Sequence, residues 1–516
     1  MKKLIVSALL SLCLSPAWSL TISVYHTSDV HGWYSARPAA WDKENSTRAI
    51  GGFPALAALV KADKNPHILL DSGDTSQGTP EGNLTKGMAT VTLMNQLGYS
   101  AAAVGNHDYD YTESNLRKMA AASSFTWLGG NIRVRETGAP ADYVKPYIII
   151  EKAGKRIAVI GLAGRHTATT TLPANVKHLE FRDEAEEASR WTAEVKKLNP
   201  DAIIILAHLG LDADFSGQKV DVSTWTFPGG RSGYGTLRIA RAAAPDILLG
   251  GHNHTGLAQG YYDKESGTLL AESYWQLTSV SKISLEFDDR TGKLKNAKDE
   301  LIPLWTDITG EDPAVKETIK GFTAGVDKEM GKVISESSVD LGASPEGLDS
   351  DIGNWFTDAM RRQSGVDVAF QNTAGIRSVM WKGPIKLRDI FQVMPFENTL
   401  VKLPMTGSQI RNLMADNLRG GRSKLQVSGI KVTFRNTPEG PKDITIEKDG
   451  KPVQPGDILS VGTNNYLTTG GTGGKVFIEV GGLDDTLRPL RDMLIKDIRE
   501  NPVKSAPEGG RITRLE

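Results

Sequence analysis

Six short apolar segments recur along the first 300 residues, and each ends in glycine, aspartate, asparagine or histidine. They are Thr21–Tyr25, His67–Leu70, Ala101–Val104, Arg156–Ile160, Ala202–Ala207 and Asp246–Leu249. Strands that are apolar on both faces must be covered on both sides. Segments between them, such as Glu184–Leu198 and Tyr234–Ala243, repeat apolar residues at helical spacing. The pattern predicts an α/β fold in which sheets form a sandwich and helices lie outside.

Polar residues of the kinds that bind metals lie just beyond five of these six strands. The clusters are Asp29-Val30-His31, Gly73-Asp74, Gly105-Asn106-His107-Asp108, His208 and Gly251-His252-Asn253-His254. Loops beyond strand ends are where layered α/β folds collect ligands. Carboxylates, imidazoles and one amide form a mixed oxygen and nitrogen set, which suits zinc, manganese or iron better than calcium.

Each of these residues alone has an ordinary structural explanation, because a single buried histidine or aspartate is usually a core group or a cap. Five clusters at five strand ends favour a metal site instead. Five of the nine histidines belong to the clusters. We interpret the other four as structural, namely His26, His67, His166 and His178.

The order of the motifs Asp-x-His, Gly-Asp, Gly-Asn-His-Asp, His and Gly-His-x-His resembles the calcineurin-like metallophosphoesterase superfamily. The resemblance implies an N-terminal β-sandwich flanked by helices that holds two divalent metal ions, zinc or manganese, with Asp74 bridging them. It implies two further sets of ligands, which are Asp29, His31 and His254 for one ion and Asn106, His208 and His252 for the other.

His107 follows a ligand and is therefore expected close to the ions without binding them. Asp110 lies three residues on and could accept a hydrogen bond from the His107 ring, which would keep the ring cationic. The resemblance implies that this pair stabilises the transition state or assists the leaving group. Alternatively, Asp110 caps a helix that begins near Thr112, and the two roles are compatible.

A second globular unit begins near Val333 and contains a predicted helix, Ile352–Gln363, with Ser350 or Asp351 as its N-cap. Four of its segments are similar, in order, to the C-terminal domain of 5′-nucleotidases. They are Gly353-Asn354 with Asp358-Ala359, residues 371–377, residues 394–398 and residues 466–471. The resemblance extends over nearly the whole chain and is closest to the bacterial secreted type, the periplasmic 5′-nucleotidase/UDP-sugar hydrolases.

The second unit supplies candidate substrate residues. Phe396 and Tyr466 stand on separate loops and could sandwich a nucleobase. Asn398 could bond a base edge, Arg377 could grip phosphate, and Asn372 belongs to the same resembling segments. Core packing would equally explain the two aromatic rings, and a surface ion pair would explain Arg377.

Two departures from the family pattern bear on the substrate. Residues 344–349 contain no arginine, although the family usually carries one or two there to hold phosphate. The family's Gly-Gly-Asp-Gly reads Gly471-Thr472-Gly473, which removes the charge that grips the ribose hydroxyls. Fewer basic groups argue against long polyphosphate substrates.

The N-terminus resembles a secretory signal. Lys2 and Lys3 precede the apolar run Leu4–Leu14, and small residues follow at Ala17 and Ser19. We therefore expect a periplasmic or secreted protein without a membrane anchor. The net charge of −1 gives no reason to expect a nucleic-acid polymer as a partner, which leaves a nucleotide or nucleoside as the expected ligand.

These observations predict a signal peptide over residues 1–19, a catalytic domain over 20–307, a linker helix over 308–331 and a smaller C-terminal α/β nucleotide-binding domain over 332–516. The expected activity is release of phosphate from nucleoside 5′-monophosphates. One alternative is a phosphodiesterase or pyrophosphatase that acts on cyclic nucleotides, UDP-sugars or NAD. Another is a non-catalytic nucleoside-binding protein.

Overall fold

Two six-stranded sheets form the first unit of the computed structural model, which describes residues 20–212, 215–225, 227 and 235–515. The predicted signal segment lies outside these residues. The first sheet has the order β18-β17-β1-β4-β5-β6. Its strands are β1 (Thr21–Thr27), β4 (His67–Asp71), β5 (Tyr99–Ala103), β6 (Thr126–Leu128), β17 (Ser279–Phe287) and β18 (Leu294–Pro303).

The second sheet has the order β15-β16-β13-β11-β9-β8. Its strands are β8 (Tyr147–Lys152), β9 (Lys155–Leu162), β11 (Ala202–Ala207), β13 (Ile247–Gly250), β15 (Tyr261–Asp263) and β16 (Thr268–Glu272). β9, β11 and β13 are parallel neighbours. Because parallel strands end at one edge of a sheet, the loops that follow these three strands emerge side by side.

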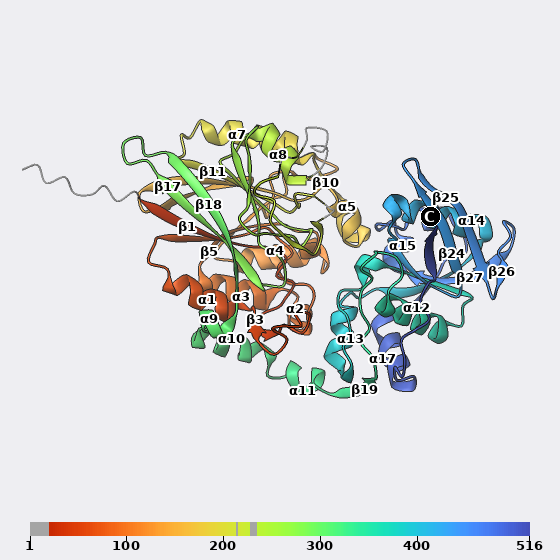
Figure 1. Cartoon of the computed structure of the whole chain (residues 1–516). Helices are drawn as coiled ribbons and strands as arrows, with labels where there is room; N and C mark the ends of the chain where they lie inside the picture. The colour runs from red at the N-terminus through yellow and green to blue at the C-terminus, as the bar shows by residue number, and fades with distance from the viewer. Residues whose placement is uncertain (1–19, 213–214, 226, 228–234, 516) are drawn as a thin grey trace, which may run out of the picture.

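The sheets pack face to face through aliphatic side chains of both, which include Ile22, Val24 and Leu70 on one side and Val159, Ile204 and Leu249 on the other. Helices cover the outer faces (Figure 1). They are α1 (Phe53–Ala62), α3 (Met88–Leu97) and α4 (Glu113–Ala122) on the first sheet and α7 (Glu184–Lys196) and α8 (Gly235–Ala243) on the second. The predicted sandwich with outer helices is confirmed.

The segment between the two units forms two helices, α10 (Pro313–Thr323) and α11 (Val326–Met330), where the sequence suggested one polar helix. Val315 and Ile319 of α10 are buried in the core that α1 and α3 cover. One apolar pair at i and i+4 is therefore enough to fasten α10 to the first unit. α11 then leads to β19 (Val333–Ser337), at the bottom of Figure 1.

The second unit contains a five-stranded sheet, β23-β20-β27-β22-β28, and a four-stranded sheet, β26-β25-β24-β29. Its strands are β20 (Val368–Asn372), β22 (Thr399–Thr406), β23 (Leu425–Ser428), β24 (Lys431–Thr437), β25 (Gly440–Lys448), β26 (Lys451–Pro452), β27 (Ile458–Asn464), β28 (Asp484–Pro489) and β29 (Ile512–Leu515). Its main helices are α12 (Asp351–Ser364), α13 (Leu387–Val393), α14 (Gly407–Asn417) and α17 (Leu490–Glu500).

The N-cap of α12 is Ser350, one of the two residues expected there. Its hydroxyl accepts a hydrogen bond from the Gly353 N–H, which satisfies a donor of the first turn.

Candidate active site

The seven predicted metal ligands lie on the loops that follow β1, β4, β5, β11 and β13, and the sandwich brings these strand ends to one place. Their ligand atoms fall into compact groups. Those of Asp29, His31 and His254 lie within 4.8 Å of one another, and so do those of Asp29, Asp74 and His208. The structure therefore brings together residues that are more than 200 positions apart in the sequence.

Five of the seven have positive φ angles, a backbone conformation that residues other than glycine rarely adopt. They are Asp29 (52°), His31 (49°), Asp74 (60°), His252 (69°) and His254 (56°). A residue held in such a conformation costs about 1–3 kcal/mol and persists only where its surroundings fix it. Clustering of this strain at one site is typical of a functional centre.

Asp108 helps to hold the backbone of these ligand loops in place. Its carboxylate accepts hydrogen bonds from the backbone N–H groups of Gly105 at 2.8 Å and of Asp74 and Thr75 at 3.1 Å. It thereby ties the loop after β4 to the loop after β5. The sequence placed Asp108 in a ligand cluster but indicated no role for it.

In the first ligand group, the contacts of His31 determine its tautomer. Its Nδ1 lies 2.7 Å from the Gln77 carbonyl oxygen, which can only accept, so Nδ1 carries the proton. Nε2 is therefore the nitrogen whose lone pair can bind a metal. This Nε2 lies 3.1 Å from Nε2 of His254, which in turn lies 3.6 Å from Asp29 Oδ1.

The second group repeats this arrangement around His208, whose Nδ1 lies 2.7 Å from the Ser72 carbonyl oxygen. Its Nε2 lies 3.1 Å from both Asn106 Oδ1 and Asp74 Oδ2. The same Asp74 oxygen lies 3.9 Å from His31 Nε2. Asp74 thus faces both groups, as a bridging carboxylate would.

The charge of the site also suits metal ions. Burial lowers the pKa of His208, but the carboxylates of Asp74 and Asp29 outweigh it and raise this pKa to about 10. Carboxylates that attract a proton so strongly attract a metal cation in the same place, and metal binding would displace the proton. The oxygen and nitrogen donors, the fixed tautomers and this negative charge together fit two divalent ions of the zinc type.

His107 and Asp110 form the predicted pair beside these ligands. Nδ1 of His107 lies 2.8 Å from Asp110 Oδ2, and the backbone N–H of His107 donates to Asp74 Oδ1 at 2.7 Å. Burial lowers the pKa of His107, but Asp110 and Asp74 raise it, and the net shift is upward. Asp110 therefore holds the ring in place and favours its cationic form.

Asp110 does not cap the following helix, so that alternative is wrong. α4 begins at Glu113 with Thr112 as its N-cap, and no side chain caps it. Both oxygens of Asp110 are used elsewhere, because Oδ1 accepts a hydrogen bond from Thr171 at 2.8 Å.

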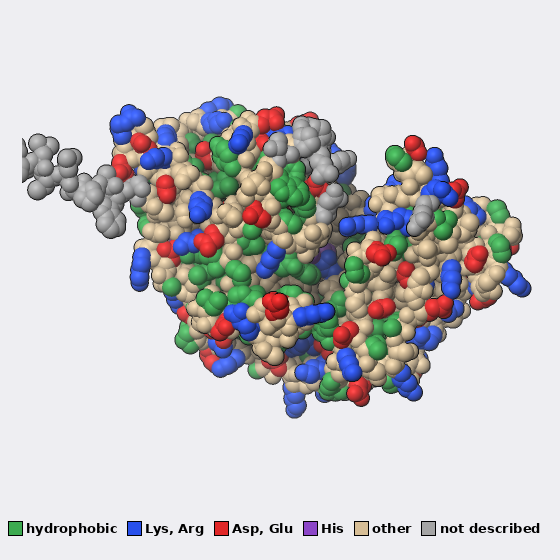
Figure 2. All heavy atoms as spheres, in the orientation of Figure 1, with side chains coloured by type: hydrophobic (Ala, Val, Ile, Leu, Met, Phe, Trp, Pro, Cys, Tyr) green, Lys and Arg blue, Asp and Glu red, His purple; other side chains and the backbone are tan. Residues whose placement is uncertain are grey.

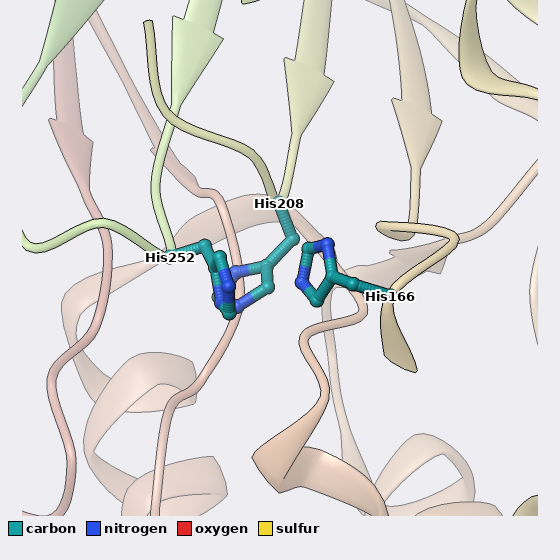
Figure 3. Close-up of side chains that lie close together, drawn as sticks. All are labelled: His166, His208 and His252. Carbon is teal, nitrogen blue, oxygen red and sulfur yellow. The ribbon is translucent and has the colours of Figure 1, made fainter. Parts of the chain in front are cut away.

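His166, which we interpreted as structural from the sequence, lies among the candidate ligands. Its ring stacks on that of His252 with centroids 3.7 Å apart. The ligand atoms of His166, His208 and His252 lie within 4.8 Å of one another (Figure 3). The sequence did contain a signal, because His166 lies in the loop after the one strand of the six that had no assigned cluster.

The other three histidines outside the clusters contact residues that are not candidate metal ligands. His26 is buried against Ser72, with Nε2 2.8 Å from the hydroxyl oxygen. His67 packs edge-on against Tyr25, and His178 pairs with Glu113 at 2.5 Å.

A cavity of ≈ 790 Å³ separates the ligand loops from the second unit. Figure 2 shows the surface hollowed between the two units. The first unit contributes Asn106, His107, Asp110 and His252 to its wall. The opposite wall includes all five predicted substrate residues, namely Asn372, Arg377, Phe396, Asn398 and Tyr466. The candidate substrate groups and the candidate metal centre thus share one cavity.

Arg377 crosses this cavity. Its guanidinium donates to Nε2 of His31 at 3.1 Å, so it reaches the first ligand group from the second unit. The surface ion pair that would equally explain Arg377 is absent among the described residues. A guanidinium fork in this position is suited to an anion that lies next to the metal ions.

The two aromatic rings are only partly enclosed by protein. The Phe396 ring lies 5.5 Å from the His107 ring at an interplanar angle of 30°. Gly471 covers one face of Tyr466 closely, since a Cβ there would lie 2.4 Å from Tyr466 Cζ. The Tyr466 hydroxyl donates to the Thr169 carbonyl oxygen at 2.6 Å, which connects the two units.

Basic residues of the cavity come from a different loop than the family pattern suggests. Arg419, Arg422 and Lys424, which precede β23, line the wall. Within the described part of the chain, Arg422 and Lys424 form no ion pair. The absence of arginine from residues 344–349 therefore does not leave this wall of the cavity without basic groups.

Thr472, which stands where the family carries an aspartate, is used for contact between the units. Its backbone N–H and its hydroxyl both donate to the Thr169 carbonyl oxygen, at 3.0 and 3.2 Å.

Two family models match the chain in succession: calcineurin-like phosphoesterase over residues 22–256, and 5′-nucleotidase, C-terminal domain, over residues 333–479. The trifunctional nucleotide phosphoesterase protein YfkN of Bacillus subtilis is 27% identical over 91% of this chain, which spans only 33% of that protein. Protein UshA of Yersinia enterocolitica is 26% identical, over 90% of this chain and 89% of its own length.

A solved structure extends the similarity to three dimensions. The 5′-nucleotidase precursor of Thermus thermophilus aligns with a TM-score of 0.83 at 26% identity, over 96% of this chain and 100% of that one.

Proposed function

This chain belongs to the 5′-nucleotidase family of calcineurin-like phosphoesterases, and we propose on that premise that it releases phosphate from nucleoside 5′-monophosphates. One observation carries the proposal. The candidate metal ligands and the candidate nucleoside-binding side chains face each other across a single cavity of ≈ 790 Å³. A cavity of this size suits a small-molecule ligand.

Seven side chains would hold two divalent ions, zinc or manganese. Asp74 would bridge the ions, and the other ligands would be Asp29, His31 and His254 for one ion and Asn106, His208 and His252 for the other. When bound, the ions would supply positive charge that neutralises phosphate oxygens, and they would lower the pKa of a water, which can then lose a proton and attack phosphorus.

His107 would assist from the side of the cavity. With its ring held by Asp110 and its pKa raised, it can donate a hydrogen bond to an oxygen on which negative charge develops. Arg377 would turn its guanidinium from His31 to the phosphate, which it can grip with two parallel hydrogen bonds.

The nucleoside would lie toward the second unit. Phe396 and Tyr466 would stack on the base, while Asn372 and Asn398 offer amide groups to its edge or to the ribose. Because stacking works with every base, this arrangement predicts broad base tolerance.

The proposed stacking predicts an effect of Tyr466→Ala that depends on the substrate. We expect kcat/KM for AMP to fall about 10- to 100-fold, since a stacking contact contributes about 1–3 kcal/mol. Hydrolysis of an alkyl phosphate without a base should change little. Tyr466→Phe is the control, because it keeps the ring and removes only the hydroxyl, which donates to the Thr169 carbonyl oxygen and accepts from the Thr472 N–H.

Core packing makes a different prediction for the same variants. If Tyr466 only stabilises the fold, both substrates will lose activity alike and the melting temperature will drop. That result would remove base stacking from the proposal.

The unpaired Arg422 and Lys424 favour one rival activity, cleavage of a pyrophosphate bond in UDP-sugars or NAD. A panel of AMP, UMP, a 2′,3′-cyclic nucleotide, UDP-glucose, NAD and a phenyl phosphate ester, assayed with added Mn²⁺ or Zn²⁺, distinguishes the activities. We expect AMP and UMP to be the best substrates. Cleavage restricted to diesters or pyrophosphates would overturn the monophosphate assignment, and binding without any phosphate release would indicate a non-catalytic protein.

We also propose that the protein acts in the periplasm or outside the cell, on the strength of the charged and apolar N-terminal pattern. No helix among the described residues is long and apolar enough to cross a membrane. Fractionation of cells that express residues 1–516, with N-terminal sequencing of the recovered protein, tests this location and the cleavage after residue 19.

A further inference from the structure

His166 lies beside the second candidate metal position, although no ligand set described above includes it. It follows β9. In the sheet, β9 lies beside β11, and β11 lies beside β13. His208 and His252 follow β11 and β13. Three adjacent parallel strands therefore each send one histidine to the same strand-end space, as Figure 3 shows.

The fold makes room for this ring. Gly164 lies directly beneath it, and a Cβ at position 164 would lie 2.0 Å from His166 Cε1 and 2.5 Å from Nδ1. Any other residue at 164 would therefore displace the ring.

The short segment that carries His166 is tied to the active site at several points. α5 (Thr167–Thr170) begins directly after it. The Thr170 carbonyl oxygen accepts from Asn106 Nδ2 at 3.2 Å, and the Thr171 hydroxyl donates to Asp110 at 2.8 Å. These contacts hold His166 in place.

One nitrogen of the ring has no partner. Nε2 of His166 is buried and forms no hydrogen bond. A buried imidazole nitrogen without a partner is costly unless it binds something. Its position among the ligand atoms of His208 and His252 offers a metal cation as that partner.

We propose that His166 is an additional ligand of the ion held by Asn106, His208 and His252. Metal–nitrogen bonds of about 2.0–2.1 Å place two ligand atoms of one ion at most about 4.2 Å apart. The ligand nitrogens of the three histidines lie within 4.8 Å of one another, which is close to that separation. This inference rests on the proposed two-metal function.

The simplest competing explanation is that His166 only supports His252 by stacking, with centroids 3.7 Å apart. His166→Phe separates the two explanations, because phenylalanine can stack but cannot bind a metal. His166→Ala removes both properties. His178→Ala is the matched control, since it removes a histidine whose partner, Glu113, lies outside the ligand groups.

The experiment measures metal binding directly. Each purified protein is stripped of metal, reloaded with Zn²⁺ or Co²⁺ and titrated against a chelator, and bound metal is counted by mass spectrometry. We expect His166→Ala and His166→Phe both to bind one of two ions at least about 10-fold more weakly, as loss of groups around a metal commonly does. The Co²⁺ absorption spectrum should change for that ion alone.

Two outcomes would overturn the inference. Unchanged affinity and Co²⁺ spectrum in both variants would show that His166 does not bind metal. Normal binding in His166→Phe with weakened binding in His166→Ala would assign it a stacking role. If the unmodified protein bound no metal at all, the two-metal function itself would fail, and that result is distinct from both.

Discussion

Asp74→Asn is expected to lower turnover by about 10³-fold or more, because it removes the charge that both metal positions share. Asp74 is 1% exposed, with Oδ2 facing both His208 and His31. Asparagine keeps the shape and can still accept the His107 N–H. Its amide would bring two N–H groups toward the cations, however, and the negative charge that keeps two dications together would be lost.

The measurement pairs turnover on AMP with metal content and melting temperature. Asp497→Asn provides a matched control, because Asp497 is fully buried in the second unit and bonded to Arg362 at 2.7 Å. It makes the same chemical change far from the metals and should lower stability while metal content and the activity of the folded fraction stay normal. Near-normal turnover with two ions in Asp74→Asn would refute the bridging assignment.

The sandwich could be predicted because its central strands are apolar on both faces. Such strands appear in the sequence as short uninterrupted apolar segments. Ala202–Ala207 was expected and observed with the same limits, and the other five strands shifted by only a residue or two at either end. Strand ends could therefore be located well enough to recognise the polar residues that follow them. The order of those residues, more than any one of them, indicated the metal chemistry.

The sequence did not place His166 among the candidate ligands, because its position depends on the path of a loop. It lies six residues beyond the end of the predicted strand Arg156–Ile160, so adjacency to a strand end did not single it out. The close approach of Gly164 to this ring and the stacking of the ring on His252 are three-dimensional properties. The only indication in the sequence was that no cluster of candidate metal ligands had been assigned after this strand.

The basic residues of the cavity were missed for a related reason. Arg422 and Lys424 lie in a loop that has no periodicity and no ligand motif. They line the cavity only because the second unit turns this loop toward the first. Contact between the units in turn includes the hydrogen bond of Thr472 to Thr169. Those contacts join residues some 300 positions apart, which no local pattern encodes.

His107→Ala is the other large effect we expect, with turnover about 10²- to 10⁴-fold lower and metal content unchanged. The side chain of His107 is not among the metal-binding groups, and its ring nitrogen Nδ1 bonds Asp110. Its contact with Asp74 uses the backbone N–H, which alanine retains. The substitution therefore removes a hydrogen-bond donor from the cavity and leaves the metal ligands in place.

Asp110→Asn sharpens this test, because it preserves the His107 ring and weakens only the group that orients and charges it. If the pair acts as proposed, Asp110→Asn will lose less activity than His107→Ala, and the double variant will lose little more than His107→Ala alone, since residues that act as a unit are not additive. Independent, additive losses would mean that Asp110 acts mainly through its bond to Thr171. Loss of an ion from His107→Ala would instead make His107 a metal ligand, and the second metal position would then need to be reassigned.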